Sequence, residues 1–353
     1  MSAPAHCSLA PRKVCSYQPA WERRWDEYVY RHNRGSIFHL ITWKRVIERA
    51  FGFQSRYLAM VDRGSIRGVL PLFLVKNVIQ GKSLISTPFA VYGGICADDE
   101  ETSAALRLAA CRMAEEEGAD YLELRERCTA AYPSFQQKQL YVTFDQRLPG
   151  NPEQLLRGFP RDTRYMIRKA QKHGLLSVVD NQQLDIFYNI YAFSVRQLGT
   201  PVFAKSFFKV LLEEFGNQCE ITTVRRGEHS VAAVLSLHFR NWIVPYYAGS
   251  LAEGRRLAAN NFMYWEVMRR AIEAGIEYYD FGRSKMGTGA HAFKSQWNMP
   301  EKHLPYQFYL LRRNEMPNFS PANPRFRLGI WFWKHMPLSL TKMVGPSIVR
   351  LFP

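Results

Sequence analysis

The sequence predicts an α+β protein in which one structural unit occurs twice, followed by a basic, aromatic tail. Three observations support this. The length of 353 residues suits two domains. Hydrophobic residues make up 47% of the chain, which is enough for packed cores. Segments of the first half recur in order in the second half, at shifts of about 155–165 residues. We expect domains at 15–147 and 148–316, and a tail at 317–353.

The repeated unit begins with a helix. Trp43–Gln54 aligns with Phe207–Gln218, and in both segments the helical pattern ends on a Phe-Gly pair. Glycine is the usual residue just after a helix because it adopts the left-handed conformation without strain. Both copies are therefore predicted to have a helix that stops at this glycine.

Strands, a second helix and a returning strand complete the unit. Strands are predicted at 68–75 and 231–239, and a further strand in each copy ends near Tyr92 or Tyr247. Helices follow at 102–117 and 260–274, stopped by Gly118 and Gly275, and strands return at 121–124 and 278–281. A strand meander, a helix and a strand that rejoins the sheet form an α+β arrangement.

The charge of the chain points to an anionic partner. Lys and Arg number 47 against 31 Asp and Glu, which gives a formal net charge of +16. Residues 282–353 carry eleven of the basic residues and two acids. The net charge suggests nucleic acid, an anionic substrate or an acidic membrane surface as partner, although the protein could simply be a basic enzyme. The clustering in 282–353 favours an anionic substrate or a membrane surface over a uniformly basic shell.

The cysteines and the N-terminal residues exclude several classes of protein. The six cysteines form no C-x-x-C pair: Cys7, Cys15, Cys96, Cys111, Cys128 and Cys219. Neither a zinc site nor a disulfide framework is expected. Residues 1–19 contain no apolar signal segment, and no run of about 18 apolar residues occurs. We therefore expect a cytoplasmic protein without a metal.

The tail at 326–353 combines Trp, Phe, Leu and Met with cations only. It either packs back over the core or lies in a membrane interface, where aromatic and cationic side chains are both favoured. The second interpretation predicts peripheral contact with the cytoplasmic face of the membrane.

Three motifs carry a resemblance to a known family. They are RYMIRKAQKHGL at 164–175, STPFAVYGG at 86–94, and DFGRS at 280–284 followed by Gly287, Gly289, Phe293 and Lys294. Together they resemble the FemAB family of aminoacyltransferases, and most closely FemAB-like proteins found with PEP-CTERM/exosortase and exopolysaccharide genes. The resemblance implies two tandem GNAT-like acyltransferase domains and an acceptor from the cell envelope, such as a peptidoglycan or exopolysaccharide precursor.

The donor implied by the resemblance is an aminoacyl-tRNA or another acyl carrier. Acetyl-CoA enzymes with the GNAT fold hold the pyrophosphate on a glycine-rich loop at a helix N-terminus. The equivalent segments are GICADDE at 94–100, which is acidic, and EGRRLAA at 253–259, which has no second glycine. Acetyl-CoA is therefore disfavoured, and no bound cofactor is expected.

The predicted catalytic residues are Lys294, Asp280 and Arg283. A lysine ammonium could stabilise an oxyanion or neutralise a phosphate, and Asp280 or a group of the substrate would remove the acceptor's proton. Asp280 and Arg283 could equally form a structural ion pair, and Lys294 could be a surface lysine.

The remaining predicted site residues bind substrate. Gly282 allows close approach of a ligand to the backbone, Ser284 and Phe293 flank it, and Tyr92, Tyr247 and Asn260 are strand-end or helix-start residues. Arg164, Arg168 and Lys169 belong to a predicted helix at 161–172. Four cations of this helix share one face by their spacing: Arg161, Arg164, Arg168 and Lys172. This face either binds phosphate or is simply solvated; the tyrosines could equally be core residues, and an asparagine there could be a helix N-cap.

The sequence thus predicts an acyl- or aminoacyltransferase that acts on an anionic, amine- or hydroxyl-bearing envelope precursor. The alternative is a non-catalytic basic scaffold that binds RNA or tethers a polysaccharide or exosortase assembly at the membrane.

Overall fold

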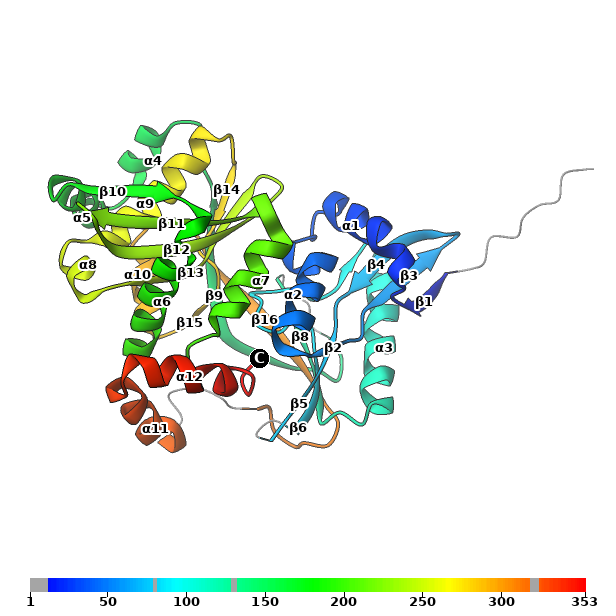
Figure 1. Ribbon diagram of the computed structural model, residues 1–353. Coiled ribbons are helices and arrows are strands. Elements are labelled where there is room, and N and C mark those ends of the chain that lie inside the picture. The colour runs from blue at the N-terminus through cyan, green and yellow to red at the C-terminus, as the bar shows by residue number, and fades with distance from the viewer. Residues whose placement is uncertain (1–11, 79–80, 128–131, 318–323) are drawn as a thin grey trace, which may run out of the picture. The chain divides into compact units, whose positions relative to one another are not determined.

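The computed structural model describes residues 12–78, 81–127, 132–317 and 324–353 (Figure 1). These form two compact units: one comprises 1–138 and 305–316, and the other 139–304 and 317–353. The chain passes between them within β9 (Gln136–Arg147) and β16 (Glu301–Leu310). Segment 305–316 thus groups with the first unit and the tail with the second. Whether 15–147 and 148–316 are separate folding domains stays a prediction.

The first unit contains a four-stranded sheet and strands of a larger sheet. Its elements up to β9 are β1 (Lys13–Ser16), α1 (Glu22–Arg31), α2 (Ile41–Phe51), β2 (Gln54–Ser55), β3 (Leu58–Asp62), β4 (Ser65–Leu70), β5 (Phe73–Asn77), β6 (Gly81–Ile85), β7 (Cys96–Ala97), α3 (Glu100–Glu116) and β8 (Tyr121–Arg125), with 3-10 turns at Pro19–Trp21 and Ile37–His39. One sheet has the order β1-β3-β4-β7, and the other includes β8-β6-β5-β2 with β16 antiparallel to β8. Strand β6 is parallel to β8, and α3 lies between them in the chain.

The second unit is built around the sheet β10-β11-β12-β13-β14-β9. Its elements are α4 (Pro152–Gly158), α5 (Arg161–Lys172), β10 (Leu175–Val179), α6 (Leu184–Leu198), α7 (Lys205–Phe215), β11 (Cys219–Arg226), β12 (His229–Phe239), β13 (Trp242–Ser250), α8 (Ala252–Arg256), α9 (Ala259–Glu273), β14 (Tyr278–Asp280), β15 (Ser284–Lys285), α10 (Gly289–Ser295), α11 (Pro324–His335) and α12 (Leu338–Val349), with 3-10 turns at Asn181–Gln183 and Gly216–Gln218. Only β13 and β14 are parallel in this sheet, and α9 connects them.

Helices cover both faces of this sheet. Successive side chains of β13 point to opposite faces of the sheet. The contacts of two consecutive residues therefore show which helices cover each face. Tyr247 packs against Tyr191 of α6 and Phe208 of α7. Its neighbour Ala248 packs against the core cluster that includes α5 and α9. The parallel β13–α9–β14 crossover matches β6–α3–β8 of the first unit, which agrees with the repeat seen in the sequence.

Most predicted elements are confirmed. The helix glycines Gly52 and Gly216 have positive φ after α2 and α7, as do Gly118 and Gly275 near the ends of α3 and α9. The predicted helix at 161–172 is α5.

Three local predictions are wrong. The strand expected at 68–75 is two strands, β4 and β5, in different sheets, because Pro71 has no N–H to continue a ladder. Tyr92 does not end a strand: it lies in an irregular segment and packs against Phe38. Asn260 does not cap α9, since the N-cap is Ala258, in the left-handed conformation at φ 59°.

The four described cysteines are free thiols, whereas Cys7 and Cys128 lie outside the described residues, as do 1–11 of the N-terminal segment and 318–323 of the tail. Within the ranges given above, no helix is long and apolar enough to cross a membrane.

Candidate functional site

The candidate site is the turn that follows β14. Gly282 has φ +69°, a conformation that strains any residue with a Cβ, so a glycine allows the chain to reverse here. Asp280 is fully buried, and its Oδ1 accepts hydrogen bonds from the Gly282 amide at 2.8 Å and from the Thr143 hydroxyl. The Asp280 carboxylate therefore stabilises the turn from inside the protein.

Lys294 holds this turn from the other side. It lies on α10, whose first turn is capped by the Thr288 hydroxyl. Its Nζ donates to the carbonyls of Phe281 at 2.7 Å, Gly282 at 2.9 Å and Arg283 at 3.4 Å. An ammonium has three N–H groups, so these three carbonyls can satisfy it completely.

The electrostatic setting of Lys294 is that of a buried cation. Burial lowers the pKa of Lys294 from 10.5 to about 8; the nearby Asp280 carboxylate opposes this fall and Arg283 adds to it. The alternative interpretation of Lys294 as a surface lysine is therefore wrong, since only 9% of the residue is exposed.

Arg283 extends from the same turn. Its guanidinium lies 4.7 Å from the ring centroid of Tyr141 on β9, in a cation–π contact. The next two residues form β15, which pairs with β9. The buried hydroxyl of Ser284 has no hydrogen-bond partner among the residues that the structure describes. A cation and a free hydroxyl thus adjoin the turn.

Tyr247 lies at an irregularity in the sheet of the second unit. The pairing of β12 and β13 shifts by one residue there, since Leu235 faces Tyr247 while Ser236 faces Pro245. Such bulges often redirect side chains beside functional sites. Burial raises the pKa of Tyr247 well above 10, and the charge of Arg283 partly counteracts this rise. Tyr247 therefore stays an uncharged phenol at neutral pH.

Helix α5 has one buried side and one basic side. Thr163, Ile167 and Ala170 are its buried side. The cations lie on the other side, with Arg161, Arg168 and Lys172 exposed and Arg164 and Lys169 half-buried. The Thr163 hydroxyl donates to the Gln296 carbonyl at 2.7 Å, just after α10. The predicted grouping of these cations on one side of the helix is confirmed, and α5 contacts the end of α10 through its opposite, buried side.

The other predicted binding residues do not join this group. Tyr92 belongs to the first unit, where Arg127 lies over its ring. Phe293 is half-buried and packs beside Tyr264 on the core of the second unit. Asn260 is the second residue of α9. The roles predicted for all these site residues stay predictions.

The structure adds two residues that sequence reasoning missed. Thr143 and Tyr141 come from β9, more than a hundred residues before the turn that they contact. Their only signal was a run of alternating polar and apolar residues, which marks a strand but not its neighbour.

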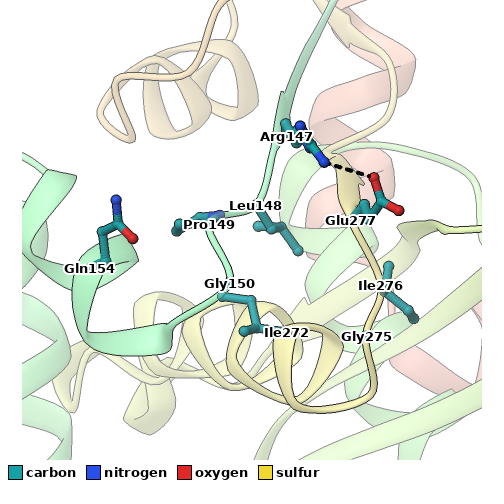
Figure 2. A pocket seen from close by; sticks show the side chains of 9 residues that line it. All are labelled: Arg147, Leu148, Pro149, Gly150, Gln154, Ile272, Gly275, Ile276 and Glu277. Carbon is teal, nitrogen blue, oxygen red and sulfur yellow. Dashed lines mark hydrogen bonds and ion pairs between the residues drawn. The ribbon is translucent and has the colours of Figure 1, made fainter.

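A separate surface cavity of about 530 Å³ lies at the other end of β14 (Figure 2). Its lining includes Leu148, Ile272 and Ile276, and the exposed pair Arg147–Glu277 at 3.2 Å. None of the predicted site residues lines it. Across the described part of the chain, no group of three or more His, Cys, Asp or Glu residues could hold a metal.

Comparison with known proteins identifies the domain that contains the turn. Residues 157–295 match the family model described as an acetyltransferase (GNAT) domain. This segment of the second unit is therefore similar to GNAT acetyltransferase domains. A comparison with curated proteins gives no match.

Solved structures show the same fold over most of the chain. FemX has a TM-score of 0.65 at 16% identity and covers 90% of this chain and 100% of its own. The C-terminal domain of a putative lysylphosphatidylglycerol synthetase from Agrobacterium fabrum has 0.54 at 14%, covering 82% and 91%. A tandem GNAT protein from the clavulanic acid biosynthesis pathway has 0.52 at 10%, covering 84% and 98%. The predicted fold of two GNAT-like units in tandem is confirmed.

Proposed function

We propose that this protein transfers an acyl or aminoacyl group to an amine or hydroxyl of an anionic cell-envelope precursor. The observation that carries the proposal is the buried Lys294 ammonium, bonded to the backbone turn that positions Arg283 inside a GNAT domain. We further propose that the acceptor is a peptidoglycan or exopolysaccharide precursor of a PEP-CTERM/exosortase system. The reaction would take place on the cytoplasmic face of the membrane.

The chemistry is a substitution at the donor ester. The acceptor nitrogen or oxygen attacks the ester carbonyl, and a tetrahedral oxyanion forms. The ester C–O bond then breaks, and the proton lost by the acceptor goes to the departing hydroxyl. Arg283, fixed by the turn, would offset the negative charge, and the Lys294 ammonium would add to the positive field.

The proton is best removed by a group of the substrate. Asp280 is fully buried, and its Oδ1 already accepts two hydrogen bonds. A general base has to reach the proton that it abstracts, directly or through one water molecule. Of the two bases considered from the sequence, we therefore favour the substrate group over Asp280.

The basic face of α5 supports an anionic acceptor. Its cations form no ion pair within the described residues, so the exposed side of α5 carries an excess of positive charge. Unpaired cations on a fixed helix bind phosphate groups without needing other ligands. A sugar or peptide carried on a phosphate fits this requirement.

The β13–α9 connection argues against acetyl-CoA as donor. A pyrophosphate loop needs free backbone amides at the helix start. Here α8 fills the connection, and the amides of Arg255, Leu257 and Ala258 already donate to carbonyls of the chain at 3.1–3.2 Å. Glu253 adds a carboxylate. We propose an aminoacyl-tRNA or another acyl carrier as donor.

To test the proposal, the purified protein is incubated with amine-bearing envelope precursors and either radiolabelled acetyl-CoA or charged tRNA, and transfer of the acyl or aminoacyl group to the precursor is measured. The proposal would be supported if the wild type transfers the aminoacyl group from charged tRNA, the Lys294→Met variant does not, and the Lys209→Met variant still does. Lys209 is an exposed lysine of α7 and serves as the matched control. Salt-dependent tRNA binding without transfer from any donor would favour the scaffold function instead.

A further inference from the structure

The two C-terminal helices expose apolar side chains at helical spacing. In α11 these are Leu328, Trp331 and Phe332, with exposed fractions of 68%, 55% and 56%. Residues three and four apart lie on one side of a helix. These three side chains therefore form a continuous apolar stripe on α11 that is open to solvent. Large exposed apolar surfaces mark interaction sites.

Helix α12 repeats the pattern. Leu340, Met343 and Val344 are exposed by 42%, 69% and 38%, at the same i, i+3, i+4 spacing. Only Met336 and Pro337 separate the two helices in the chain. We call these six residues of α11 and α12 the apolar stripes.

The apolar stripes are not the side by which these helices pack on the second unit, because each helix is already packed there through its opposite side. Trp333 is 6% exposed and donates from Nε1 to the Thr200 carbonyl at 2.9 Å. Gly345 fits so closely that a Cβ there would lie 2.6 Å from the Val202 carbonyl oxygen. Arg196 of α6 donates to the Met336 carbonyl at 2.9 Å. Figure 1 shows both helices beside α6.

The positive charge around the apolar stripes indicates an anionic partner. Residues 317–353 contain five Lys and Arg residues and no Asp or Glu. Lys334 is exposed on α11, three residues after Trp331. A second copy of the chain would bring two positive surfaces together, which is unfavourable. Aromatic and aliphatic side chains among cations are typical of helices that lie in the interface of an anionic bilayer.

We propose that the apolar stripes of α11 and α12 insert into the headgroup region of a bilayer that contains anionic lipid. The helices would lie along the surface, since neither is long and apolar enough to span it. This docking would hold the GNAT domain of the second unit at the membrane. It does not depend on the proposed transferase activity, so either proposal can fail while the other stands.

The test measures sedimentation of the full chain with vesicles of phosphatidylcholine alone or mixed with phosphatidylglycerol. We expect binding to the mixed vesicles that weakens as salt is raised. The double variant Trp331→Ser/Phe332→Ser should bind at least about tenfold more weakly. Lys334→Glu should also weaken binding, by about fivefold or more.

Leu108→Ser is the matched control, because Leu108 is 53% exposed on α3, outside the tail. Circular dichroism and unfolding curves verify that each variant is folded. The proposal would be overturned if the double variant bound vesicles as strongly as the wild type. It would also be overturned if the wild type did not bind mixed vesicles, or bound both vesicle types equally. Light scattering that shows a wild-type dimer which the double variant abolishes would overturn it as well, because a second copy would then cover the stripes.

Discussion

Replacing Lys294 by Met tests the buried cation through stability and activity together. The methionine has a similar length but cannot donate to the carbonyls of Phe281, Gly282 and Arg283. A hydrogen bond from a charged group contributes about 1.5–3 kcal/mol. Against this loss, the methionine avoids the cost of burying an ammonium. The two effects oppose each other, so we expect the free energy of unfolding at pH 7 to change by no more than about 2 kcal/mol.

The pH dependence separates the two effects. The pKa of Lys294 is about 8 in the folded protein against 10.5 for an exposed lysine. Between these values the unfolded chain binds more protons than the folded chain, so raising the pH stabilises the wild type. A difference of 2.5 pH units corresponds to about 3 kcal/mol. Methionine does not titrate, so the variant lacks this gain.

Urea unfolding followed by tryptophan fluorescence, from pH 7 to 10.5, measures the effect. The difference in unfolding free energy between wild type and Lys294→Met should be constant below pH 8 and shift by about 3 kcal/mol above it. Transfer activity should fall by at least about 100-fold even where stability is unchanged, because the turn loses its position. A difference that does not depend on pH would refute the argument that Lys294 is a buried ammonium.

Three further changes test other parts of the structure. Arg283→Gln should lower transfer by about 100-fold in the same assay while changing the unfolding free energy by less than about 1 kcal/mol, since a cation–π contact such as that with Tyr141 is weak; unchanged transfer would remove Arg283 from the site. Burial raises the pKa of Glu126 from 4.5 to about 7, so the folded state binds more protons than the unfolded one between these values and loses up to about 3 kcal/mol as the pH rises through them. Glu126→Gln should therefore gain stability over wild type at pH 8 but not at pH 4, as measured by urea unfolding, and an equal effect at both pH values would contradict this. Gly345→Ala should destabilise the second unit by about 1–3 kcal/mol in thermal unfolding, because its Cβ would meet the backbone of Val202; no change would show that α12 is not docked there.

The repeat is the strongest result that the sequence supplied. Helix-ending glycines at Gly52 and Gly216, and at Gly118 and Gly275, fix the ends of corresponding helices because only glycine adopts these positive φ values at little cost. Local signals of this kind survive divergence of the side chains around them. The local pattern gave a wrong prediction at Pro71, where a single proline divides the predicted strand into two strands of different sheets.

The candidate site was predicted only in part. The DFGRS segment and Lys294 are near in sequence, and α10 returns the lysine to the turn within one short connection. The burial of Lys294 could not be predicted, because a lysine in a glycine-rich stretch looks exposed. The contact with Tyr141 depends on the pairing of β15 with β9, which sequence periodicity does not specify.

The sequence by itself determined the tandem α+β units, the excess of positive charge toward the C-terminus and the residues of the turn, since these depend on composition and on local backbone preferences. Only the tertiary structure decided that Asp280 is enclosed, that Lys294 is a buried cation bonded to carbonyls, and that α11 and α12 dock on one side while the apolar stripes stay open. Burial and partner choice arise from contacts between segments far apart in the chain, and no local pattern encodes them.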